Sequence, residues 1–292
     1  MVLEKEVDAV LVTVVTPSYN QGRFIKETIE SVLTQDYPNI EYIIVDGGST
    51  DETIEILKSY GERIRWISEN DEGQADAVNK GISMARGEVI GWLNSDDTYL
   101  PGAISKVANE FNLNSGIDMV YGEGYHISEH GDILDRYPTE KYDWEKLAQT
   151  CFICQPTAFI RKNVIENLGG LNKNLQLCMD YDLWIRIGQT YEIKYISEYL
   201  ATSRLYESNK TLSRTDEVYS EAVTTVKKYY GFVPLTWVYG YVYNSSAYKS
   251  SKGLTRLKFY ALLKFITINR RHPVLCIKQL MASFLKKMLQ LR

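Results

Sequence analysis

Apolar positions along the first hundred residues alternate between strand-like and helix-like spacing. Residues 9–16 form a continuous, mostly β-branched apolar run, which is typical of a strand buried on both faces. A turn at 17–22 leads into residues 23–34, whose apolar side chains recur at helical spacing. Strand, loop and helix repeated in this way predict an α/β fold with a mostly parallel, Rossmann-like sheet flanked by helices. Further strands are predicted at 41–45, 63–68 and 88–93, and further helices at 52–60 and 75–85.

Polar clusters follow three of the predicted strands directly. They occupy residues 17–21, 46–51 and 94–97. In sheets of this kind, ligands bind in the crevice beyond the carboxyl ends of the strands. We therefore expect the three clusters to converge in space.

The predicted structure changes twice in the rest of the chain, after residue 100 and beyond Pro234. Residues 100–203 mix short strands and helices, and residues 216–230 form a predicted helix that Gly231 ends. Beyond Pro234, an aromatic stretch leads to two basic amphipathic helices. We predict a first domain over residues 1–230, with halves at about 1–100 and 101–215, and a C-terminal helical extension over 231–292 whose helices cover 254–268 and 274–291.

Charge is distributed unevenly along the chain. The net charge is −4, but residues 249–292 contain eleven Lys or Arg and no Asp or Glu, which leaves a net of −15 for the preceding residues. Basic amphipathic helices favour the interface of anionic bilayers, so we predict an anionic membrane surface as a partner. The alternative is packing against the first domain or another subunit, as in a homo-oligomer. Nucleic acid is not expected, because an acidic body repels phosphates.

The N-terminus and the cysteines favour a cytoplasmic protein, peripheral on the inner face of the cell membrane. Residues 1–9 lack the basic start and long apolar stretch of a secretion signal. No uncharged apolar run reaches the roughly 18 residues that a spanning helix needs. Four cysteines in 292 residues do not resemble a disulfide framework, and Cys151 and Cys154 lack the further ligands that would complete a zinc site.

Two adjacent carboxylates, Asp96 and Asp97, follow the strand predicted at 88–93. Such neighbours repel one another unless a cation or hydrogen-bond donors compensate. Mg²⁺ and Mn²⁺ favour carboxylate oxygens and commonly bind through one or two of them together with substrate phosphates. A helix-capping loop is the alternative, but the expected position of the pair beside Asp46 favours a Mn²⁺ or Mg²⁺ site.

Four motifs occur in order: residues 16–20 (TPSYN), 45–51 (VDGGSTD), 79–81 with 85–87 (NKG, ARG) and 93–97 (LNSDD). Together they resemble the family 2 glycosyltransferases of the GT-A fold, over roughly residues 10–203. The resemblance implies an inverting, metal-dependent enzyme of the hexosyltransferase type. It would move a sugar from a nucleoside-diphosphate sugar, with a UDP-sugar as the expected donor, to a hydroxyl of a saccharide or lipid-linked acceptor. Relatives build surface polysaccharides, lipid-linked oligosaccharides and glycolipids.

The resemblance also implies roles for individual residues of the donor site. Asp97 would bind the metal, and Asp96 would bind the ribose or the metal. Asn94 stands where many relatives have another Asp, which removes a charge from the motif. Asp46 would accept a hydrogen bond from the base. The complete set of expected donor-binding residues is Thr16, Pro17, Ser18, Tyr19, Asp46, Gln74, Asn79, Asp96 and Asp97.

Residues 179–184 (MDYDLW) resemble the family's Glu-Asp motif, whose Asp is the general base. The match assigns that role to Asp180, since an acceptor hydroxyl is a poor nucleophile until a carboxylate takes its proton. Capping of a helix start is the alternative, and Asp182 is expected to be structural or supporting. Gln155 and Trp184 are the expected acceptor-binding residues.

Other positions depart from the family pattern or admit two interpretations. Tyr206 stands where many relatives carry the His of an Arg-x-His motif, so the metal would depend more on carboxylates, diphosphate oxygens and water. Arg204 or Lys210 would either steady the diphosphate or be solvated at the surface. Residues 69–76 form an acidic loop whose charges we expect to be mostly solvated.

Two rival functions are compatible with parts of the sequence. A sugar-phosphate nucleotidyltransferase would need a glycine-rich, basic phosphate loop, whereas residues 17–22 contain no Lys or Arg and one Gly. A catalytically silent sugar-binding or scaffolding subunit would not need Asp96, Asp97 and Asp180, all of which are present. We therefore predict an active glycosyltransferase.

Overall fold

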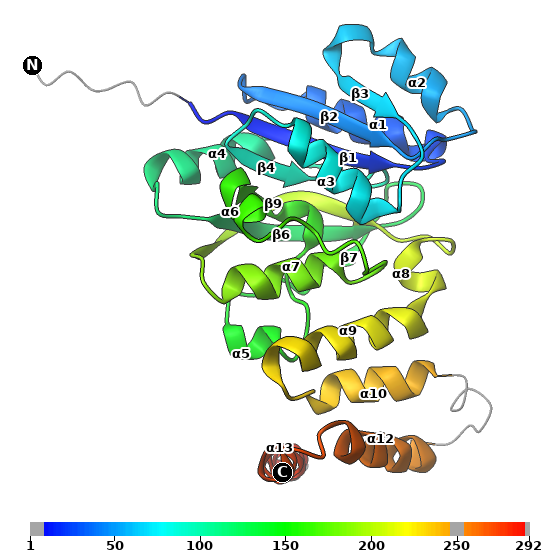
Figure 1. Cartoon of the computed structure of the whole chain (residues 1–292), viewed down its shortest axis with the longest axis vertical. Helices are drawn as coiled ribbons and strands as arrows, with labels where there is room; N and C mark the ends of the chain where they lie inside the picture. The colour runs from blue at the N-terminus through cyan, green and yellow to red at the C-terminus, as the bar shows by residue number, and fades with distance from the viewer. Residues whose placement is uncertain (1–8, 246–253, 290–292) are drawn as a thin grey trace, which may run out of the picture. The chain divides into compact units, whose positions relative to one another are not determined.

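The computed structural model describes residues 9–245 and 254–289 (Figure 1). The chain divides into two compact units. Unit 1 comprises Met1–Tyr142 and Phe152–Glu207, and unit 2 comprises Asp143–Cys151 and Ser208–Arg292. The geometric division therefore follows residue 207, and the functional boundary that we place at residue 230 stays a prediction.

One sheet forms the centre of unit 1. Its strands are β1 (Val12–Ser18), β2 (Ile40–Asp46), β3 (Arg65–Ser68), β4 (Val89–Trp92), β5 (Thr98–Tyr99), β6 (Met119–Ile127), β7 (Ile133–Arg136), β8 (Phe159–Arg161) and β9 (Ile193–Arg204). They lie in the order β3-β2-β1-β4-β8-β6-β9-β5, and β7 pairs with β6. The first four strands along the chain pair in parallel, as predicted, whereas β8 is antiparallel to β4 and β6.

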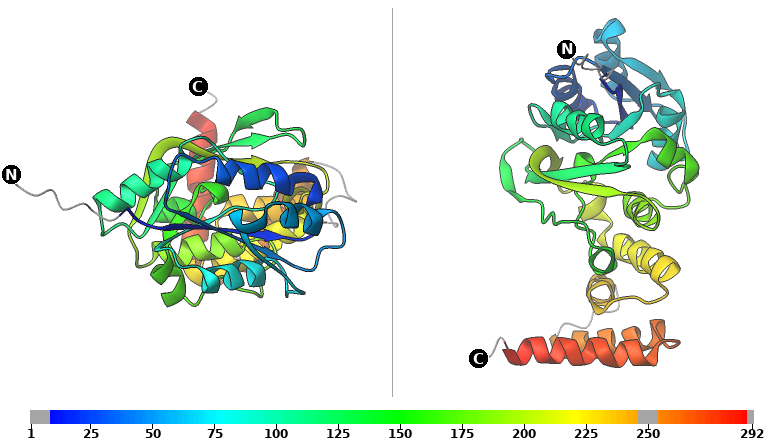
Figure 2. Two further views of the ribbon diagram at one scale, coloured as in Figure 1. Left: turned by 90° about the horizontal axis from the view of Figure 1, so that it is seen from above. Right: turned by 90° about the vertical axis from the view of Figure 1, so that its left-hand side faces the viewer.

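Helices cover both faces of this sheet (Figure 2). They are α1 (Gly22–Leu33), α2 (Thr53–Ser59), α3 (Gln74–Met84), α4 (Ala103–Leu113), α6 (Lys162–Asn167) and α7 (Met179–Gly188). Ile25 of α1 packs in one apolar cluster with Val14. Gly81 of α3 meets the opposite face, where a Cβ on Gly81 would lie 2.3 Å from Val15 Cγ1. Because neighbouring residues of a strand face opposite sides, β1 is buried throughout, as its β-branched run predicts.

Unit 2 is helical in its described residues. Its helices are α5 (Trp144–Leu147), α8 (Lys210–Ser213), α9 (Thr215–Tyr230), α10 (Leu235–Asn244), α12 (Leu254–Ile268) and α13 (Pro273–Leu289). Gly231 ends α9 at a left-handed φ of 71°, which confirms the expected stop. A small apolar core includes Val238, Leu257 and Phe265. The two predicted C-terminal helices are present as α12 and α13, and residues 290–291 lie outside the described residues. None of the described helices is long and apolar enough to cross a membrane.

Candidate active site

The loops after β1 and β2 meet at one edge of the sheet. Ser18 and Asp46 are paired in register at the ends of these strands. Asn20 Oδ1 accepts a hydrogen bond from Thr50 N at 2.8 Å, and Asn20 N donates to Ser49 Oγ at 2.7 Å. Asn20 does so at a left-handed φ of 51°, which Asn tolerates better than most residues. The first two polar clusters therefore converge.

The Asp46 carboxylate is buried and holds its own loop. Its Oδ2 accepts hydrogen bonds from Gly48 N at 3.0 Å, Ser49 N at 2.8 Å and Ser68 Oγ at 2.7 Å, and its Oδ1 accepts one from Ser49 Oγ at 2.5 Å. A carboxylate offers about four lone-pair sites. A bond from a nucleotide base to Asp46 would therefore require the exchange of one of these contacts.

The side chains of residues 16–19 differ in their access to the site. Thr16 Oγ1 shares a hydrogen bond of 3.1 Å with the Tyr42 hydroxyl inside the core. Pro17 is buried in β1. Ser18 Oγ is buried and, among the described residues, has no hydrogen-bond partner, so it can bond a ligand or a water. Tyr19 is 62% exposed, which leaves its ring accessible for stacking.

Asn94 is the centre of a hydrogen-bond network after β4. Its Oδ1 accepts from Gln74 Nε2 at 2.7 Å and from Trp92 Nε1 at 2.9 Å. Its Nδ2 donates to Asp97 Oδ2 at 3.1 Å and to Gln155 Oε1 at 2.9 Å. Two expected site residues, Gln74 and Gln155, thus meet Asp97 through Asn94.

Asp97 is 3% exposed and is held by two N–H donors. Arg204 N donates to its Oδ1 at 2.9 Å, and the Asn94 amide donates to its Oδ2. Even so, burial raises the pKa of the Asp97 carboxyl well above its usual range, and the neighbouring Asp96 carboxylate raises it further. The positive charge of Arg204 lowers this pKa but does not offset the burial, and a bound cation would add further positive charge.

The aspartate pair fits a divalent cation that binds together with a diphosphate. Within residues 9–245 and 254–289, no group of three or more His, Cys, Asp or Glu side chains is arranged to hold a metal ion. Mg²⁺ and Mn²⁺ commonly need only one or two carboxylates when substrate phosphates supply the other oxygens. Asp96 and Asp97 offer that donor set, and the burial of Asp97 beside a second carboxylate favours it.

Arg204 is a structural residue of this site. Its side chain is 1% exposed, and Nε donates to Asp96 O at 2.8 Å. Nη2 donates to Glu27 Oε2 at 2.7 Å, and Nη1 donates to Glu129 O at 3.0 Å. The guanidinium carbon also lies 4.9 Å from the centroid of the Phe24 ring. The expectation that Arg204 steadies a diphosphate or is solvated is therefore wrong, because the group is buried and its donors are used inside the protein.

Helix α7 carries the second candidate motif. Asp180 is its second residue, and Oδ1 of Asp180 accepts a hydrogen bond from Tyr181 N at 2.7 Å. Asp182 is 1% exposed and forms an ion pair with Arg186 at 2.7 Å, which is a supporting role. Trp184 is 1% exposed, so a contact with an acceptor would require a rearrangement of α7 or its neighbours.

The Cys154 thiol interacts electrostatically with both candidate motifs, the aspartate pair after β4 and Asp180 of α7. This thiol is buried, and burial raises its pKa. The carboxylates of Asp97 and Asp180 each raise that pKa further through electrostatic interaction. Both candidate motifs therefore act electrostatically on the same buried thiol.

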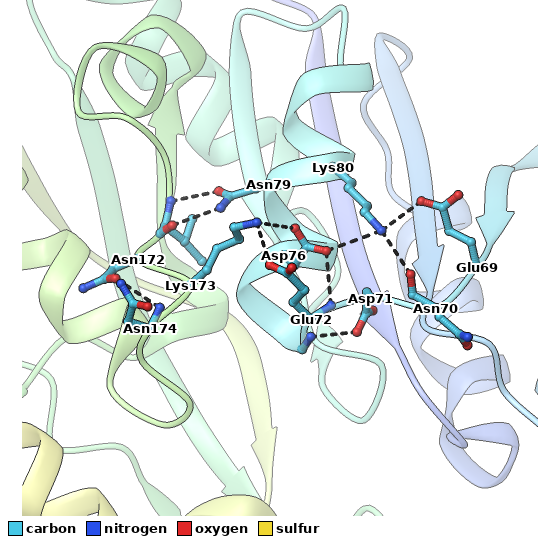
Figure 3. Close-up of polar contacts among 12 residues, drawn as sticks. Glu69, Asn70, Asp71, Glu72, Asp76, Asn79, Lys80, Asn172, Lys173 and Asn174 are labelled. Atoms are coloured by element: carbon cyan, nitrogen blue, oxygen red, sulfur yellow. Dashed lines mark hydrogen bonds and ion pairs between the residues drawn. The ribbon is translucent and has the colours of Figure 1, made fainter.

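Polar contacts tie the β3–α3 loop to the loop before α7 (Figure 3). Lys173 Nζ lies 2.8 Å from Glu72 Oε2 and 3.2 Å from Asp76 Oδ1. Asn79 Nδ2 donates to Leu171 O at 2.9 Å, and Asn79 Oδ1 accepts from Leu171 N at 2.8 Å. Glu69 and Glu72 are exposed, as expected of this acidic loop, with 58% and 73% of their side chains accessible, whereas Asp76 is 13% exposed and ion-paired. Asn79 is engaged with the loop before α7 and is not part of the aspartate network.

The sequence did not indicate two of the contacts around the aspartate pair. Asn94 donates to Asp97, and the Tyr206 hydroxyl donates to Asp96 Oδ2 at 2.9 Å. At both positions the sequence departs from the family pattern. We interpreted Asn94 as the loss of a charge and Tyr206 as the loss of a metal ligand. Each replacing side chain is instead a hydrogen-bond donor to one aspartate of the pair.

Comparisons with known proteins agree with this fold. The sequence model described as "Glycosyl transferase family 2" matches residues 13–169. The uncharacterized glycosyltransferase RP339 of Rickettsia prowazekii is 30% identical over 217 residues, which cover 72% of this chain and 68% of that protein. TarS of S. aureus in complex with UDP superimposes with a TM-score of 0.63 at 16% identity, over 88% of this chain and 80% of that one. The mannosyltransferase PcManGT from Pyrobaculum calidifontis, in complex with GDP-Man and Mn²⁺, superimposes with a TM-score of 0.57 at 16% identity, over 96% and 87%. These structures confirm the GT-A fold.

Proposed function

Since this chain belongs to glycosyl transferase family 2 and is a glycosyltransferase, we propose that it moves a sugar from a UDP-sugar to a hydroxyl of a saccharide or lipid-linked acceptor, with inversion and with Mn²⁺ or Mg²⁺. One observation carries the proposal. The buried Asp97 carboxyl lies beside Asp96 after β4, and Asn94 joins it by hydrogen bonds to Gln74 and Gln155.

The donor part of the proposal rests on the loops after β1 and β2. The exposed Tyr19 ring would stack on a nucleotide base. A uracil ring presents one N–H beside carbonyl oxygens. The Asp46 carboxylate would exchange one of its loop contacts for a hydrogen bond from that N–H, and the Ser18 hydroxyl, which has no partner among the described residues, would donate to a carbonyl. Of the two solved structures, TarS holds UDP and PcManGT holds GDP-Man.

Asp180 acts as the general base in the proposed mechanism. It accepts the proton of the acceptor hydroxyl while that oxygen bonds to the anomeric carbon. The bond from this carbon to the diphosphate oxygen breaks, and the electron pair leaves with the nucleoside diphosphate. Entering and leaving oxygens occupy opposite faces, so the configuration inverts without a covalent intermediate. A cation held by Asp97 would stabilise the negative charge of the leaving group when bound.

Donor binding is expected to depend on the metal ion. EDTA should lower the affinity for UDP by about tenfold or more, because a cation that joins a carboxylate to a diphosphate contributes several kcal/mol. Isothermal titration with UDP-, dTDP- and GDP-sugars, each in Mn²⁺, Mg²⁺ or EDTA, measures both the metal dependence and the preferred base. Uridine, which has no diphosphate, is the matched control and should bind equally with and without metal.

Three results would contradict these proposals separately. Full-strength binding of the preferred donor in EDTA would remove the cation from the mechanism. A preference for dTDP- or GDP-sugars would replace the proposed donor. Donor binding without transfer to any saccharide or lipid-linked acceptor would favour the silent sugar-binding subunit.

We infer that α12 and α13 bind an anionic membrane surface, which would place the protein peripherally on the cytoplasmic face of a membrane. Apolar side chains on these helices are more than half exposed, and basic side chains are exposed among them. Such surfaces insert apolar groups into the bilayer interface while their cations pair with anionic headgroups. The apolar residues are Phe259, Val274, Ile277 and Met281, and the basic residues are Lys258, Lys264, Arg270, Arg271 and Lys278.

The double variant Ile277→Asp with Met281→Asp should bind anionic vesicles at least about tenfold more weakly, because it loses apolar insertion and adds repulsion. Flotation with phosphatidylserine vesicles measures this, and phosphatidylcholine vesicles report charge dependence. Deleting the helices is unsuitable, because Leu257 and Phe265 belong to the core of unit 2. Leu113→Asp, at a side chain 75% exposed in unit 1, is the matched control. Unchanged flotation would end the inference, and a dimer that the double variant separates would assign this face to a second copy.

A further inference from the structure

Tyr206 contacts the aspartate pair through its hydroxyl. The hydroxyl donates to Asp96 Oδ2 at 2.9 Å. Its ring packs against Phe24, with 5.0 Å between the ring centroids, and the guanidinium carbon of Arg23 lies 5.7 Å from the centroid of the Tyr206 ring. Tyr206 is half-buried, so its ring is held by neighbours while its hydroxyl points to the carboxylate.

The segment Arg204-Leu205-Tyr206, at and after the end of β9, forms hydrogen bonds with both aspartates. Arg204 N donates to Asp97 Oδ1 at 2.9 Å, and Arg204 Nε donates to the backbone oxygen of Asp96 at 2.8 Å. The buried guanidinium is fixed by Glu27. Residues 204–206 therefore bond the backbone of Asp96 and the carboxylates of both aspartates, and the buried Arg204 side chain holds this stretch in place.

We propose that Tyr206 is a positioning residue that keeps the Asp96 carboxylate oriented for the donor's ribose and away from the cation, so that the cation is held by Asp97. This inference rests on the proposed function, because it assigns ribose binding to Asp96 and cation binding to Asp97 within the proposed donor site. A hydroxyl hydrogen bond on Oδ2 competes with a divalent cation for the same lone pairs. It also fixes the direction of the remaining lone pairs of Asp96.

Tyr206→Phe keeps the ring and its contact with Phe24 but removes the hydroxyl. Asp96 then becomes available to the cation, so Mn²⁺ binding in the absence of nucleotide should tighten by about two- to tenfold, the range that one hydrogen bond accounts for. UDP binding at saturating Mn²⁺ should weaken by a similar factor, because Asp96 loses its orientation. The electron paramagnetic resonance signal of free Mn²⁺ reports the first constant, and isothermal titration reports the second.

Tyr195→Phe is the matched control. It removes another tyrosine hydroxyl that bonds a carboxylate, that of Glu123, elsewhere in the same sheet. Neither binding constant should change in this variant. Thermal unfolding of all three proteins shows that the variants are folded.

Opposite shifts in the two constants support the inference, because a merely structural role would weaken both together. Parallel weakening, or unchanged constants in Tyr206→Phe, would overturn it while leaving the proposed function in place. If the unaltered protein binds neither Mn²⁺ nor UDP, the proposed function is refuted and the inference with it.

Discussion

Asp97→Asn loses sugar transfer by about 10³-fold or more, because its carboxylate is the proposed protein ligand of the cation. A cation that stabilises the leaving diphosphate contributes several kcal/mol, and each 1.4 kcal/mol or so changes the rate about tenfold. Transfer of radiolabelled sugar at saturating donor and Mn²⁺ measures the loss. Asp135→Asn, at an exposed carboxylate of β7, is the matched control and should transfer sugar at the normal rate.

The same variant separates the loss of a ligand from the collapse of the site. An Asn at position 97 removes the ionisation that burial opposes, but it has one acceptor for the two N–H donors that bond Asp97, so these effects offset and the melting temperature of the metal-free protein should change little. A melting temperature lowered by several degrees would mean that the network around Asn94 had failed. Transfer at more than a tenth of the normal rate would contradict the assignment of Asp97 as the metal ligand.

Asp180→Asn keeps donor affinity within about twofold but lowers the turnover number by about 10²- to 10⁴-fold, which is the usual contribution of a general base. Donor affinity is kept because the expected donor contacts lie on other loops, and the Asn side-chain oxygen can still accept the hydrogen bond from Tyr181 N. Titration with the preferred nucleotide sugar and single-turnover kinetics measure the two quantities. A normal turnover number would remove Asp180 from the mechanism.

Asp182→Asn provides a contrast two residues away on α7. Asp182 is buried against Arg186, whose guanidinium also donates to Leu168 O at 3.0 Å and to Gly170 O at 2.9 Å. Loss of one partner of a buried ion pair typically costs about 3–5 kcal/mol. This variant should therefore lose stability, whereas Asp180→Asn should lose turnover without a comparable fall in melting temperature.

The spacing of apolar residues alone predicted the architecture of the first half of unit 1. A strand buried on both faces needs a continuous β-branched run, and residues 9–16 have one. Parallel strands place their following loops at one edge of a sheet, so the convergence of the loops that carry Asn20 and Ser49 could be predicted without coordinates. The mixed second half carries weaker periodic signals, and its strand order was not predicted.

Side-chain partners could not be predicted in the same way. The contacts of Arg204 with Glu27 and of Asn79 with Leu171 join residues 177 and 92 positions apart. The residues next to a charged or amide side chain in the sequence do not show whether distant residues bury that side chain or leave it solvated. The burial of Trp184 was missed for the same reason, since the helical pattern around it does not say which neighbouring elements cover it.

The amide at position 94 limits how this site can change during evolution. Asn94 uses its oxygen toward Gln74 and Trp92 and its nitrogen toward Asp97 and Gln155, so both edges of the amide are occupied. A carboxylate has no donor, and an Asp here would break two bonds at once and bring like charge against Asp97. A protein with an acid at this position must therefore bond its residues at positions 74 and 155 differently, so we expect positions 74, 94 and 155 to covary across the family.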